Sequence, residues 1–99
     1  MAQSVKAKIS TATVSTVASD SLAAVTLAAA NVNRTQLIVH NNSTATLYLK
    51  FGATASSASH TRQLLTQTTW EMPVGNTIYT GIVTGRWAAT NGDAQVTEY

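Results

Sequence analysis

The chain has 99 residues, a length that allows one small domain with a single hydrophobic core. Charged residues make up 10% of the chain, well below the usual share of about a quarter, while hydrophobic residues make up 44%. The surface must therefore consist largely of Ser, Thr, Asn and Gln. The six basic residues are scattered along the chain, which argues against nucleic-acid binding although the net charge is +2.

Two further features of the composition narrow the possibilities. The chain contains no cysteine, so disulfide frameworks and thiolate metal sites are excluded. It has no run of roughly 18 apolar residues, and residues 1–8 lack the apolar stretch of a signal peptide. We therefore expect a soluble protein that is made in the cytoplasm.

The first thirty residues are small and have no aromatic side chain. Residues 5–9 and 12–18 alternate in polarity, so both stretches are expected to be strands. We expect residues 1–20 to form an extended N-terminal arm. Residues 20–30 fit either a short helix, capped by Asp20 or its neighbour, or an extended segment. Frequent β-branched residues favour the extended form.

The next part of the chain has the clearest strand pattern. Residues 36–40 and 46–51 each alternate between apolar and polar side chains. Between them lie residues 41–44, Asn-Asn-Ser-Thr, which favour a turn because Asn tolerates left-handed backbone. The pattern predicts a hairpin of two strands. In the second strand the leucines and Phe51 should face the core, and Tyr48 and Lys50 should face solvent.

The following segment contains a loop and a further strand pair. Residues 52–59 are all Gly, Ala, Ser or Thr, and we expect them to form an exposed, mobile loop. Residues 62–67 and 69–72 are predicted to pair as strands, with Trp70 and Met72 facing inward. Pro73, together with Gly75-Asn76, should close this pair with a turn.

The C-terminal part is expected to be a long hairpin. Residues 78–89 suit a long strand in which Gly81 and Gly85 mark bends. Asn91-Gly92 is a strong signal for a tight turn, because both residue types accept positive φ. The last strand, residues 94–98, is therefore predicted to return against the strand before it.

These elements amount to roughly seven to nine short strands joined by short turns. They predict an all-β fold, either an antiparallel β-sandwich or a jelly-roll-like barrel, with an extended N-terminal arm. The expected domains are residues 1–20 for the arm and residues 21–99 for the β-sandwich. The pattern does not specify the order of the strands.

No pattern in the chain indicates catalysis. His40 and His60 have no companion ligand at a metal-binding spacing, and the four carboxylates are dispersed. The glycines at positions 81 and 85 lack the lysine and the strand-to-helix context of a phosphate loop. We therefore expect a protein that is not an enzyme, with no catalytic residue, metal ligand or cofactor. Both tryptophans are expected in the core rather than on a sugar-binding surface.

The chain from Leu27 onward carries a set of residues that recurs in one type of protein. The set comprises Leu27, Ala29-Ala30-Asn31, Asn33-Arg34, Leu37, Val39, Asn41, Ser43, Leu47-Tyr48-Leu49, Gly52, Trp70-Glu71, Tyr79-Thr80-Gly81 and Trp87. In this set, which spans residues 27–98, the chain resembles small virion structural proteins of tailed bacteriophages. Such proteins include head decoration (cement) proteins and modules of tails or fibres. The resemblance implies a non-enzymatic, oligomeric, β-rich virion component.

We therefore expect a capsid decoration protein that binds the outer surface of the virion as a homotrimer. Its expected partners are the major capsid protein and further copies of itself, with no nucleic acid and no membrane. The arm would add a strand to a neighbouring subunit or to the capsid. The residues expected to contact subunits or capsid are Val5, Lys6, Lys8, Ile9, Arg34, Tyr48 and Tyr99.

Some alternatives stay open at this point. Arg34 precedes a predicted strand and suits either a contact between subunits or a structural role, in which it binds a carbonyl group or Glu71. Two other virion roles also fit the resemblance. One is a tail or fibre-tip module that binds a receptor glycan, and the other is a head–tail adaptor or tail-tube subunit.

Overall fold

A computed structural model describes residues 11–72 and 77–99 of the chain. These residues form eight strands in two antiparallel sheets of four strands each. The strands are β1 (Thr13–Ala18), β2 (Val25–Ala28), β3 (Leu37–Asn42), β4 (Leu47–Phe51), β5 (Arg62–Leu64), β6 (Thr69–Met72), β7 (Val83–Trp87) and β8 (Asp93–Glu98). The predicted all-β sandwich is confirmed.

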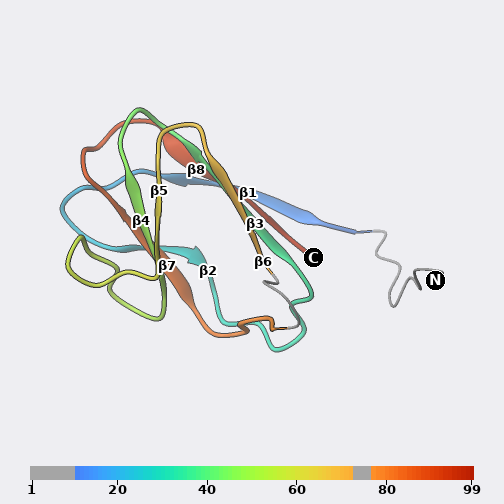
Figure 1. Ribbon diagram of the computed structural model, residues 1–99. Helices are drawn as coiled ribbons and strands as arrows, with labels where there is room; N and C mark the ends of the chain where they lie inside the picture. Colours follow the sequence, from blue (N-terminus) through green and yellow to red (C-terminus); the bar gives the residue numbers. More distant parts are fainter. Residues whose placement is uncertain (1–10, 73–76) are drawn as a thin grey trace, which may run out of the picture.

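The strand order follows from one long two-stranded ribbon. In sequence order, the first strand pairs with the last, the second with the second-last, and so on: β1 with β8, β2 with β7, β3 with β6, and β4 with β5. Two more pairings, β3 with β8 and β4 with β7, close the sheets. The result is sheet A, in the order β1-β8-β3-β6, and sheet B, in the order β2-β7-β4-β5. This is the jelly-roll form of the sandwich, and Figure 1 shows the two sheets as separate layers.

The predicted hairpins are wrong. β3 and β4 lie in different sheets, as do β5 and β6, and β7 and β8. The short connections between them therefore cross from one layer to the other. Alternation of polarity shows which face of a strand is buried, but both layers bury one face. The pattern consequently cannot tell a strand beside its neighbour from a strand opposite it.

The connection between β7 and β8 illustrates the difference. Gly92 has a positive φ of 64°, as the turn prediction required. A mirror-image hairpin turn also needs positive φ at Asn91. Among the described non-glycine residues only Thr54 and Gln67 have one. The Asn91-Gly92 turn thus redirects the chain toward the other sheet instead of closing a hairpin.

The loop between β4 and β5 is largely exposed, as predicted, but it is anchored at Ala55. Ala55 is 1% exposed. Its N–H donates to Oγ1 of Thr84 on β7 at 3.1 Å, and that hydroxyl donates to the Gly52 carbonyl at 2.7 Å. Main-chain groups of this loop bond to Thr84, so the contact needs no large anchoring side chain.

The N-terminal part of the chain is only partly described. Residues 13–18 pair with β8 over the full length of β1, so they belong to sheet A of their own chain. The strand predicted at residues 5–9 lies outside the described residues, and the domain boundary at residue 20 stays a prediction. Between residues 20 and 30 the extended alternative is correct, because β2 is a strand. Asp20 caps a turn there, accepting the N–H of Leu22 at 2.7 Å.

The core is built by an alternation that continues through the connection between β3 and β4. Every second residue from position 37 to position 49 is buried: Leu37, Val39, Asn41, Ser43, Ala45, Leu47 and Leu49. Trp70 and Trp87 pack in the same core and are 8% and 1% exposed. Both tryptophans therefore lie in the core, as predicted. Met72 is also buried, and Phe51 packs at the edge of the core against Tyr79, with ring centroids 4.6 Å apart.

One polar side chain in this core joins the two sheets. Asn41 of β3 is fully buried, and its amide nitrogen donates to the carbonyls of Ala45 and Leu64 at 2.8 and 2.9 Å. Its amide oxygen accepts the Trp87 indole N–H at 3.1 Å and the Ser43 hydroxyl at 2.7 Å. Since β5 and β7 belong to sheet B, the amide of one sheet-A residue holds two strands of the opposite layer.

Replacing this amide should be costly. We expect Asn41→Ala to lower the free energy of unfolding by about 3–5 kcal/mol, because the Trp87 indole N–H loses its partner and the Leu64 carbonyl loses a hydrogen bond inside the core. Urea unfolding followed by tryptophan fluorescence measures the change.

The neighbouring asparagine provides the matched control. Asn42 is exposed, and its side chain donates to Asp93 at 3.0 Å. Asn42→Ala should therefore cost less than about 1 kcal/mol. If the two substitutions cost the same, Asn41 does not join the sheets in the way described.

Candidate functional site

Charged side chains separate between the two sheets. These charges are scattered along the sequence, but in the fold the basic and acidic residues of the strands lie in different sheets. The strands of sheet B carry only basic charges, and the strands of sheet A carry only acidic ones, apart from His40. The basic residues are Lys50, Arg62 and Arg86, and the acidic residues are Glu71, Asp93 and Glu98.

Arg34 lies inside the molecule, at the end of the sandwich opposite Asn41. It is 2% exposed, and its Nε donates to the Glu98 carboxylate at 2.6 Å. Its two terminal nitrogens donate to the carbonyls of Tyr79, Gly81 and Ala29 at 2.7, 3.1 and 2.7 Å. The guanidinium thus ties the chain before β3 to β8, to the segment before β7 and to the end of β2.

This arrangement is the structural alternative considered for Arg34. Carbonyl groups are partners, as expected, but the carboxylate is Glu98 and not Glu71, which is exposed on β6. Tyr99 lies nearby: its carbonyl accepts the N–H of Thr35 at 3.0 Å. The other predicted contact residues of the arm, Val5, Lys6, Lys8 and Ile9, lie outside the described residues.

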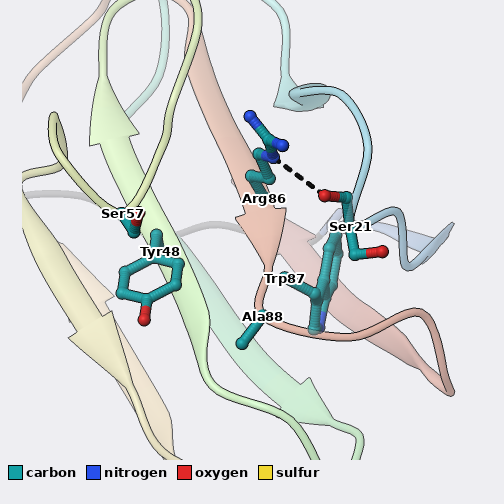
Figure 2. A pocket seen from close by; sticks show the side chains of 6 residues that line it. All are labelled: Ser21, Tyr48, Ser57, Arg86, Trp87 and Ala88. Carbon is teal, nitrogen blue, oxygen red and sulfur yellow. Dashed lines mark hydrogen bonds between the residues drawn. The ribbon is translucent and has the colours of Figure 1, made fainter.

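Tyr48 lies in the other layer, on the outer face of sheet B. It is directly opposite Arg86 across the β4–β7 pair, and its ring packs against His60 with centroids 5.0 Å apart. Beside it is an open depression of about 300 Å³. Figure 2 shows Tyr48 and Ser57 on one side of this depression and Arg86 and Ser21 on the other. Trp87 and Ala88 complete its lining.

Arg86 is held by one bond that leaves its outer end open. Its Nε donates to the Ser21 carbonyl at 3.0 Å, and this is the one hydrogen bond recorded for its side chain among the described residues. Among the described residues, the one salt bridge joins Arg34 and Glu98. No described carboxylate therefore pairs with Arg86. The two terminal nitrogens can therefore serve a ligand, and a guanidinium suits carboxylate and phosphate oxygens.

The histidines and acids show no catalytic grouping. His40 bonds through its ring nitrogens to Thr69 at 2.7 Å and to Gln67 at 3.3 Å. Among residues 11–72 and 77–99, no three potential ligands gather closely enough to hold a metal ion. No helix in these ranges could span a membrane.

The pKa of Asp93 is lowered by its neighbours. Side-chain hydrogen bonds from Gln95 and Asn42 hold the pKa of this exposed carboxyl below its ordinary value. The ionised form therefore stabilises the fold above the ordinary pKa, and this contribution is lost as the pH falls through the lowered one. Asp93 tightens the start of β8 and takes no part in the depression.

Sequence reasoning found one member of this depression and missed the rest. Alternation in β4 correctly turned Tyr48 outward. The same alternation in β7 places Arg86 outward too, because Trp87 next to it is buried. What the sequence did not show is that β4 and β7 are neighbours, so the pairing of Tyr48 with Arg86 could not be predicted.

Comparison of the chain with protein-family models, with curated proteins and with solved structures found no significant match. The resemblance to phage virion proteins therefore stays a prediction.

The role of Arg34 can be tested by a change that keeps its charge. We expect Arg34→Lys to lower the free energy of unfolding by about 2–4 kcal/mol, because an ammonium group cannot reach four acceptors in different directions. Thermal or urea unfolding measures this. Arg62→Lys on the exposed strand β5 is the control and should change stability by less than about 0.5 kcal/mol. Equal stability of the two variants would contradict the structural role.

Proposed function

We propose that the chain is a non-enzymatic virion protein that decorates and stabilises a phage capsid, as a homotrimer. The observation that carries this proposal is the edge strand β1. It has the sequence Thr-Val-Ser-Thr-Val-Ala, with no charge, proline or glycine. Five of its six residues are exposed. Among the described residues its strand partner is β8 alone.

Such an edge suits strand addition. An edge strand presents a row of main-chain N–H and C=O groups, and soluble proteins usually protect it with charges, proline or a bulge. β1 has none of these, and its pairing with β8 runs over six consecutive residues without a shift in register. A strand from a second chain can therefore extend sheet A by main-chain hydrogen bonds.

The rest of the surface is consistent with assembly by many weak contacts. A decoration protein repeats over a shell, so each subunit needs to bury only a modest area, on the order of 800 Å² per partner. Jelly rolls occur in viral capsid proteins and in lectins, but a fold alone does not define a function. The fold supports the proposal only together with the open edge.

The alternative virion roles receive less support. An exposed tryptophan would favour a receptor-binding tip, but both tryptophans are buried. An adaptor or tail-tube subunit would assemble as a ring of about six or twelve copies, and no feature of the described residues points to such a ring. We therefore retain the decoration protein as the proposal.

The proposed edge contact can be tested by adding a charge to β1. Val14 is 65% exposed on this strand, and a lysine there should oppose strand addition. We expect the wild type to have the native mass of three 10.4 kDa chains, and Val14→Lys to have the mass of one. Light scattering after size-exclusion chromatography measures both masses. Val14→Lys should also lose binding to capsids that lack the protein, measured by co-sedimentation.

Leu22 offers a matched control, because it is an 85% exposed aliphatic residue outside the strands. Leu22→Lys should remain trimeric and bind capsids. A wild-type monomer that does not bind capsids would contradict the proposed function. A Val14→Lys variant that assembles as well as Leu22→Lys would contradict the edge as the site of contact.

A further inference from the structure

We infer that the depression beside Tyr48 and Arg86 binds one anionic sugar unit, of the uronic-acid type. The sugar carboxylate would bind the Arg86 guanidinium, and one face of the sugar ring would lie on the Tyr48 ring. This inference concerns the outer face of sheet B. It does not depend on the edge of β1 or on the assembly proposed above.

The anion part of the inference rests on Arg86. The bond from its Nε to the Ser21 carbonyl fixes the direction of the guanidinium plane. A guanidinium fixed in this way loses little freedom when it binds a carboxylate through both terminal nitrogens. The side chain is half-buried, so such a pair is less screened by solvent than one at a fully exposed site.

The surrounding charge points in the same direction. Lys50 lies on the same face of β4 as Tyr48, two residues further along, whereas Arg62 on the adjacent strand β5 pairs with the inward-facing Leu49. No strand of sheet B carries an acid. An anionic ligand thus approaches strands that carry only basic charges, which raises its rate of association.

The sugar part rests on the shape and the other lining groups. Tyr48 is half-buried and is supported from one side by His60, so its ring is held as a firm platform. Ser57 lines the same depression, and its hydroxyl group suits the hydroxyls of a sugar. A volume of about 300 Å³ is at the lower end of the range for ligand pockets and suits a single ring.

The test is a titration of the ¹⁵N-labelled full chain with trigalacturonate, followed by amide chemical shifts. We expect saturable shifts at Tyr48, Ser57 and Arg86. Three reference ligands define the chemistry: neutral maltotriose, sodium phosphate and a tri-glutamate peptide. Each should bind at least about tenfold more weakly, because each lacks either the anion or the sugar ring.

Two arginine variants separate the site from general charge. Arg86→Gln should weaken trigalacturonate binding at least tenfold, whereas Arg62→Gln removes the same charge from the next strand and should weaken it less than twofold. Tyr48→Leu should weaken binding about fivefold. Unchanged amide spectra away from the substitution confirm that each variant is folded.

The following results would overturn the inference. The first is a wild type that shows no saturable shifts, and the second is an equal loss of trigalacturonate affinity in Arg86→Gln and Arg62→Gln. The third is unchanged affinity in Tyr48→Leu. The fourth is binding of phosphate, of the peptide or of the neutral sugar as tight as that of trigalacturonate. A monomeric wild type that still binds trigalacturonate would contradict the assembly proposal and leave this site supported.

Discussion

The buried amide of Asn41 is the interaction on which the rest of the structure depends. In a jelly roll most strands pair with partners that are distant in the chain, and the two layers touch mainly through apolar side chains, which have no directional preference. Asn41 adds direction: it lies on sheet A and bonds to Trp87 and Leu64 on sheet B. An unpaired amide would be expensive in this core, so only the correct arrangement of the layers satisfies it.

Arg34 does the same at the other end of β3. Arg34 lies just before β3, and Asn41 is the second-last residue of that strand. The Arg34 guanidinium bonds to Glu98, Tyr79 and Ala29, and so joins four separate parts of the chain, its own included. This inner strand of sheet A is thereby fixed to its surroundings at both ends. Two further surfaces are the edge of β1 and the outer face of sheet B. The proposed functions use these two surfaces.

The sequence allowed a good prediction of faces and a poor one of partners. Alternation correctly placed Leu47, Tyr48 and Trp70, because burial repeats with the period of a strand. The same alternation continues through Asn41 and Ser43, and following it would have identified Asn41 as a core residue instead of a turn residue. No local pattern could have identified Glu98 as the partner of Arg34, because 64 residues separate them. The depression beside Tyr48 was hidden for the same reason.

Hydrogen exchange tests the central claim most directly. If the Asn41 amide joins the two sheets, its side-chain N–H protons and the Trp87 indole N–H should exchange with solvent only when the whole domain unfolds. NMR of the native protein in D₂O should then give these protons the same protection as the most stable main-chain amides of β3 and β8. Exchange of either group orders of magnitude faster than those amides, in a protein that stays folded, would contradict the account.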